Sequence, residues 1–291
     1  MSRIPVGLRY MAAAAFSFAL MSLFVKGAGE RLPTMQVVLA RSVITLVITV
    51  SVLRLRGLTP WGTERRLLIL RGGLGFVALS SFYYGVIHLP LADVTVIQYT
   101  NPVFTALLAA LFLSERLGGR EVALVLASLG GVVVMARPTF LSGGAPALDP
   151  MAVSVAVAGA VFSAAAYVTV RRLGRTEDPW VVVFYFALIS TVMATPLAAP
   201  GWIQPRGWEW LLLLGVGITT QLGQVFLTQG LQRERAGRAM AVGYLQIVFA
   251  AVWGFLFYHE IPDRWSLTGA LVIVGCTYLI ARIRRGAEER K

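Results

Sequence analysis

The second half of the chain repeats the first, and both halves consist of long apolar segments. Identical residues recur at a spacing of 145 or 146 positions along the 291-residue chain. The matched pairs are Phe16/Phe162, Ser17/Ser163, Pro33/Pro179, Gly72/Gly217, Gly85/Gly230, Glu115/Glu260 and Gly130/Gly275. Each half divides into five apolar segments, and about 20 apolar residues let a helix cross the hydrocarbon core of a bilayer. Because five is an odd number, we expect the second copy to lie inverted relative to the first.

The segments predict an all-α polytopic membrane protein of ten transmembrane helices, arranged as two inverted five-helix repeats. Hydrophobic residues make up 57% of the chain, and charged residues only 14%. We assign residues 1–142 to the first repeat, 143–149 to a linker and 150–291 to the second repeat. The expected spans are 8–27, 34–54, 67–87, 92–113, 120–136, 150–170, 179–199, 209–231, 238–258 and 265–283. Inverted repeats that meet around a binding site are a common transporter architecture, so transport is the first functional hypothesis.

The net charge of +12 is distributed as membrane orientation requires. Of the 26 Lys and Arg residues, 20 fall in the termini and alternate connections, and 5 in the intervening connections. Because short basic loops stay cytoplasmic, both termini are expected on the cytoplasmic side of a bacterial inner membrane. The basic residues flank apolar segments, so no nucleic-acid partner is expected. With Cys276 as the only cysteine, we expect no metal site and no cofactor, and a monomer or homodimer.

Two segments show a recognisable family pattern. Residues 99–117 read YTNPVFTALLAALFLSERL, and residues 244–261 read YLQIVFAAVWGFLFYHEI; each is followed by an apolar segment containing glycine. The pattern resembles the EamA-type permeases of the drug/metabolite transporter superfamily, and the duplication extends the resemblance over nearly the whole chain. The second copy departs from it, because it lacks the proline and continues into Pro262. The resemblance implies a transporter rather than an enzyme. Relatives carry amino acids, other metabolites, nucleotide-sugars or drugs, and some bacterial members export amino acids.

Polar side chains within the spans mark the candidate binding site, because burying them in a membrane is costly. Gln98, Tyr99, Tyr244 and Gln246 lie near mid-span in the fourth and ninth segments, which the repeat symmetry should bring together. Pro102 predicts a kink that serves as a hinge in the fourth segment, with Ile247 at the matching position of the second copy. The full candidate set for substrate binding is Arg41, Tyr83, Tyr84, Gln98, Tyr99, Asn101, Ser163, Tyr167, Gln221, Gln224, Tyr244 and Gln246. The fifth and tenth spans are almost wholly apolar and are expected at the periphery.

The charged residues constrain the substrate. Arg41 is the only charge that we place well inside a span; it could bind a substrate carboxylate, or cap carbonyl groups near the outer leaflet. None of the 14 acids lies near mid-span, which argues against a proton relay and favours a neutral or zwitterionic substrate. Glu115 and Glu260 fall at helix ends, where each is expected to be structural, near the start of the following helix.

The leading hypothesis is therefore a transporter that exports small molecules by alternating access through a central cavity. Amino acids, aromatic or otherwise neutral, or related small metabolites are the expected substrates. The sequence does not fix direction, so an uptake permease for another metabolite stays open. An integral-membrane transferase is the alternative from another class. It would need paired acids for a metal-bound diphosphate, or a nucleophile with its base, and the sequence shows neither motif.

Overall fold

The computed structural model describes residues 4–89, 91–115, 117–137, 148–258 and 264–283, and within these ranges the regular structure is helical. Most of the proposed linker at 143–149 lies outside them, as do His259 and Glu260. The helices are α1 (Val6–Gly29), α2 (Thr34–Leu55), α3 (Arg65–His88), α4 (Leu91–Gln98), α5 (Asn101–Leu113), α6 (Gly119–Ala136), α8 (Pro150–Leu173), α9 (Pro179–Ala198), α10 (Gly207–Arg233), α11 (Ala236–Val242), α12 (Leu245–Tyr258) and α13 (Arg264–Arg282), with a short 3-10 turn at Ala199–Gly201.

Ten stretches of the described chain are long and apolar enough to span a membrane. Eight of them are single helices, and the other two are the pairs α4–α5 and α11–α12. This confirms the predicted all-α, multi-pass fold of ten spans. Many large apolar side chains remain exposed on the helix surfaces, among them Leu111, Leu211 and Leu271. Such a surface is expected where the surrounding solvent is lipid.

The two halves pack on each other through reciprocal contacts between matched residues. A Cβ atom added at Gly72 of α3 would lie 2.4 Å from Ile189 of α9, and one added at Gly217 of α10 would lie 2.4 Å from Ile44 of α2. Gly72 matches Gly217, and Ile44 matches Ile189, at the same 145-residue spacing. Each helix therefore approaches its partner from the other half closely enough to require glycine. Small residues allow this close packing of transmembrane helices.

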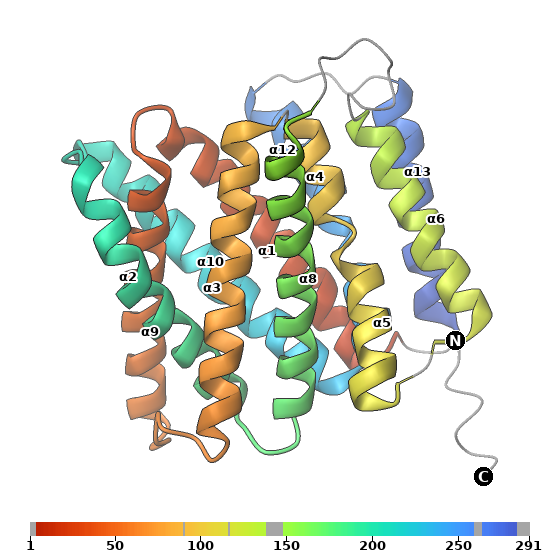
Figure 1. Cartoon of the computed structure of the whole chain (residues 1–291), viewed down its shortest axis with the longest axis horizontal. Coiled ribbons are helices and arrows are strands. Elements are labelled where there is room, and N and C mark those ends of the chain that lie inside the picture. The colour runs from red at the N-terminus through yellow and green to blue at the C-terminus, as the bar shows by residue number, and fades with distance from the viewer. Residues whose placement is uncertain (1–3, 90, 116, 138–147, 259–263, 284–291) are drawn as a thin grey trace.

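The paired helices divide the molecule into a middle and two edges (Figure 1). The matched helices α2 and α9 pack together at the left edge of the view, and α6 packs on α13 at the right edge. Between them, α1 packs against α10 and α3 packs against α8. Each of these four pairs therefore joins a helix of the first half to a helix of the second half. The fifth and tenth spans thus lie at the periphery, as their apolar sequences predict.

Both the fourth and the ninth span are broken near their middle. Tyr99 and Thr100 form a turn between α4 and α5, and Gly243 and Tyr244 form a turn between α11 and α12. Pro102 lies in the first turn of α5, where its missing N–H is tolerated, rather than inside a kinked helix. The second copy has Ile247 in place of Pro102, but a glycine-containing turn interrupts its span at the matching position as well.

A network of charged side chains joins the halves at the end of the molecule that carries the arginine-rich connections. Glu115 Oε1 accepts a hydrogen bond from Arg171 Nε at 2.6 Å, and Glu115 Oε2 accepts one from the backbone N–H of Ala236 at 2.9 Å. Glu115 is therefore structural, as expected, but it caps the start of α11 in the other half. The helix that follows it, α6, is capped by Glu121, whose Oε2 accepts from the Gly118 N–H.

At the opposite end, Arg31 and Glu209 tie the connection between α1 and α2 to the start of α10. Arg31 Nε donates to Glu209 Oε1 at 2.7 Å, and Arg31 Nη2 donates to Glu209 Oε2 and to the carbonyl of Gln204. The hydrogen bond to Glu209 raises the pKa of the Arg31 guanidinium. Each end of the bundle thus has an ion pair that connects the two halves.

We predict that Glu115→Gln lowers the melting temperature of the detergent-solubilised protein, because it removes the ion pair with Arg171. A hydrogen bond between charged groups contributes about 1.5–3 kcal/mol. Scanning fluorimetry would measure the shift, with Glu30→Gln, at an exposed position, as the control. Equal melting temperatures for the two variants would contradict the structural role of Glu115.

Candidate functional site

The breaks in the two matched spans bring Tyr99 and Tyr244 together. Their rings stack with centroids 5.9 Å apart and planes inclined by 29°. The two residues are separated by 145 positions, so they are equivalent in the two copies. Tyr244 is fully buried, and within the described chain its hydroxyl has no hydrogen-bond partner. Interrupted helices near mid-membrane are tolerated only inside a protein or beside a cavity, and they commonly form transporter sites.

Four further candidate residues lie in the same region, on α4, α5 and α8. Gln98, the last residue of α4, donates its side-chain N–H to Ser163 Oγ of α8 at 3.3 Å. Tyr167, one helical turn further along α8, lies within electrostatic range of Tyr99. Asn101 is buried at the start of α5, and its side-chain oxygen accepts no hydrogen bond from the described residues. The region between α4, α5 and α8 is therefore polar, with unsatisfied hydrogen-bonding capacity.

Arg71 is a buried charge that the sequence reading missed. We counted it among the loop residues because it lies near the predicted start of the third span, so the expectation of Arg41 as the only charge inside a span is wrong. The side chain is 2% exposed, and its guanidinium lies 4.2 Å from the centre of the Phe186 ring. Its Nη2 donates to Gln224 Oε1 at 3.2 Å. The glycine run after Arg71 was the available signal, since Gly75 leaves room for the guanidinium.

A polar face of α2 meets a polar face of α10 beside Arg71. Arg41, Thr45 and Thr49 follow one another at four-residue intervals, so they share one side of α2. Thr49 Oγ1 donates to Gln221 Oε1 of α10 at 3.2 Å, one turn from Gln224. Arg41 is 6% exposed and lies within electrostatic range of Arg71. The structure thus brings Arg41, Gln221 and Gln224 into one interior region with Arg71.

Other candidates are placed elsewhere or make fewer contacts. Tyr83 lies near Arg41. Tyr84 instead stacks on His88, with ring centroids 4.0 Å apart, near the end of α3 and away from the stacked tyrosines. Gln246 is half-buried in the first turn of α12, and its side chain makes no hydrogen bond to the described residues. The polar interior is therefore formed chiefly from α2, α3, α8, α10 and the two breaks.

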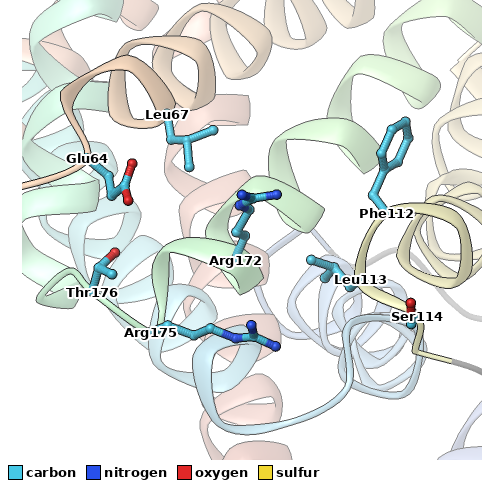
Figure 2. A pocket seen from close by; sticks show the side chains of 8 residues that line it. All are labelled: Glu64, Leu67, Phe112, Leu113, Ser114, Arg172, Arg175 and Thr176. Atoms are coloured by element: carbon cyan, nitrogen blue, oxygen red, sulfur yellow. The ribbon is translucent and has the colours of Figure 1, made fainter.

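A pocket of about 320 Å³ opens at the end of the bundle that carries the arginine-rich connections (Figure 2). It is lined by Glu64, Leu67, Phe112, Leu113, Ser114, Arg172, Arg175 and Thr176. Leu67 is one helical turn before Arg71 on α3, a rise of about 6 Å. A second pocket, of about 340 Å³, lies between α5 and α6 and has only aliphatic lining residues. It faces the periphery and offers no polar group to a substrate.

The buried acids lie at helix ends rather than in this interior. Within the described ranges the buried carboxylates are Asp93, Glu121, Glu177, Glu209 and Glu234. Asp93 is more deeply buried than its position near a predicted span end suggests, but it still belongs to the first turn of α4. Across these ranges, no three His, Cys, Asp or Glu side chains are grouped as a metal site would require. The chemistry of the interior is that of guanidinium, amide, hydroxyl and aromatic groups, which can bind a small molecule.

A duplicated ten-span bundle with matched helix breaks and a polar interior is typical of membrane transporters. The sequence matches the model of the EamA-like transporter family twice, at residues 5–137 and 150–282, so the chain belongs to this family. The two matches identify two copies of the family unit, separated by the region where we placed the linker. The chain is a transporter of small molecules rather than an enzyme.

Relatives with assigned names are also transporters. The chain is 34% identical to the pseudopaline exporter CntI of Pseudomonas aeruginosa over 274 residues, covering 94% of this chain and 95% of the relative. It is 30% identical to human solute carrier family 35 member G1, covering 92% and 77% of the two chains. It is 26% identical to the S-adenosylmethionine uptake transporter of Rickettsia felis, covering 90% and 88%. A crystal structure that is 18% identical in sequence has the same fold, with a TM-score of 0.84 over 96% of this chain and 98% of the other.

We predict that Tyr244→Phe leaves the melting temperature unchanged or raises it. The substitution keeps the ring that stacks on Tyr99 and removes a buried hydroxyl without a partner, whose burial costs about 1–3 kcal/mol. Tyr244→Ala should lower the melting temperature, because it removes the ring from a well-packed position. Scanning fluorimetry of both variants measures the contrast. A large loss of stability in Tyr244→Phe would show that the hydroxyl is a structural hydrogen-bonding group.

Proposed function

We propose that the protein exports amino acids or related small metabolites by alternating access, with the substrate bound in the interior around Tyr99 and Tyr244. The observation that supports this most directly is the meeting of two matched helix breaks at a stacked, buried tyrosine pair. Small ligands bind in sites with apolar walls and a few placed polar groups, and Gln98, Ser163 and Tyr167 supply such groups here. The absence of mid-span acids from the sequence argues against a cationic substrate, which would need a central anion.

The relatives support export without excluding uptake. The exporter of Pseudomonas aeruginosa is similar along nearly its whole length, whereas the Rickettsia felis relative is named for uptake. An uptake permease for another metabolite is therefore the second candidate. Purified protein in liposomes separates the two when radiolabelled phenylalanine, leucine and glutamate are placed first inside and then outside, with protein orientation determined by protease digestion. Faster movement from the cytoplasmic to the outer face supports export.

We predict that Tyr99→Ala and Gln246→Ala each reduce flux about fivefold, because the loss of one neutral hydrogen bond costs on the order of 1 kcal/mol. Flux is measured in liposomes at equal protein content, after fluorescence-detected size-exclusion chromatography has confirmed folding. Leu271→Ala is the control, because this side chain is 74% exposed on the peripheral helix α13. Normal flux in both site variants, together with altered substrate preference in Leu271→Ala, would contradict the interior site.

We also propose that both termini lie in the cytoplasm of a bacterial cell, with the protein in the inner membrane. In a Cys276→Ser background, we predict that an impermeant thiol reagent labels Gly201→Cys but not Thr59→Cys in intact cells. Both positions are exposed, at opposite ends of the bundle. Thr59 lies in a connection rich in arginine, which the positive-inside rule places in the cytoplasm. Labelling of Thr59→Cys alone would reverse the orientation.

A further inference from the structure

Arg71 is buried as a cation without an anionic partner. Its Nε and Nη1 atoms are inaccessible to solvent and donate no hydrogen bond to a described residue, while Nη2 donates only to the neutral Gln224 amide. The Phe186 ring attracts the charge but does not neutralise it. A guanidinium has donors and no acceptor, so the group that its free donors require is an acceptor, and an anion binds them most strongly.

Other arginines of the same chain show what a structural role looks like. The buried Arg238 donates to the carbonyls of Ile280 and Ile283 at 2.8 Å and lies 3.8 Å from a Glu234 carboxylate oxygen. Arg171 pairs with Glu115 and donates to the Gln232 carbonyl at 2.7 Å. These two side chains cap helix ends and are matched by carboxylates. Among the described residues, Arg71 has neither kind of partner.

Arg41 adds a second positive charge to the same interior. Both guanidiniums belong to membrane-spanning helices, and their charges repel one another. Neither forms an ion pair with a described residue, and the buried carboxylates of the described chain lie at helix ends. Two uncompensated charges inside a membrane protein are costly and mark a functional site.

We infer that the substrate is an organic anion with more carboxylates than amines, and that one carboxylate binds the Arg71 guanidinium. This inference rests on the proposed transport function, because the site lies in the same interior. The positive charge of Arg41 would attract a second carboxylate of the same ligand. Gln224, beside Arg71, and Tyr167, within electrostatic range of it, supply neutral groups that can orient the ligand. The sequence favoured neutral substrates because Arg71 was counted among the loop residues and not among the charges inside the spans.

Two further observations agree with an anion path. A Cβ atom added at Gly75 would lie 2.6 Å from Arg71 Nη1, so this glycine provides the space that the guanidinium occupies. The pocket beside Leu67, which is one turn before Arg71 on α3, contains the exposed side chains of Arg172 and Arg175 and a single carboxylate, Glu64. The lining therefore has more positive than negative charge, which attracts anions.

The test compares ligand binding in wild-type protein, Arg71→Met, Arg71→Lys and the exposed control Arg54→Met. Thermal shifts in detergent are measured with succinate, L-glutamate, L-phenylalanine and L-lysine. Succinate and glutamate should stabilise the wild type and Arg54→Met, whereas lysine should not. Arg71→Met should weaken the affinity for both dicarboxylates about tenfold or more, and Arg71→Lys should restore part of it. The melting temperature of ligand-free Arg71→Met should equal or exceed that of the wild type, because a buried uncompensated charge has been removed.

The outcomes separate this inference from the proposed function. If phenylalanine crosses liposomes carrying the protein while succinate and glutamate neither bind nor cross, the anion site is wrong and transport stands. If the dicarboxylates bind through Arg71 but no amino acid or dicarboxylate crosses, the anion site stands and the proposed export is wrong. Should Arg71→Met fail to fold, Gly75→Ala displaces the guanidinium instead and should weaken dicarboxylate binding. Unchanged binding in that variant would overturn the inference.

Discussion

The structure depends on the close approach of helices from opposite halves, which glycine makes possible at Gly72 and Gly217. Each of these residues faces an isoleucine of the other half, and an added methyl group would overlap it. In a membrane, helices gain little from hydrophobic burial against one another, so tight van der Waals contact becomes a main source of association. Because the contacts are reciprocal, the two copies form one bundle rather than two five-helix units. The helix breaks at Tyr99 and Tyr244 then meet, and the two rings pack against apolar side chains of α6 and α13.

The same packing makes buried polar groups possible. Backbone groups released at a helix break cannot face lipid, so both breaks must lie against other helices or a cavity. Arg71 is enclosed by Phe186 and Gln224, which come from α9 and α10 in the other half. Charged pairs at the two ends of the bundle, Glu115 with Arg171 and Arg31 with Glu209, are also formed between the halves. The interior is thus a product of the duplication.

The duplication, the ten spans and the peripheral position of the fifth and tenth could be predicted from the sequence, because span length and residue matching depend on local composition. The pairing of Tyr99 with Tyr244 followed from the same symmetry. The break in the ninth span was missed because a search for proline overlooks glycine, which also interrupts helices. Arg71 was missed because the sequence alone does not distinguish an arginine one or two turns inside a span from an arginine in the preceding loop. Only packing against Phe186 reveals that the side chain points inward.

We propose that the substrate binds between the two halves, beside the stacked tyrosines and within reach of Arg71. The most direct measurement is an experimental structure of the protein with a transported substrate bound. We expect ligand density within hydrogen-bonding distance of Arg71 Nε or Nη1, extending towards the rings of Tyr99 and Tyr244. Density confined to the aliphatic pocket between α5 and α6, with the guanidinium of Arg71 uncontacted, would contradict it.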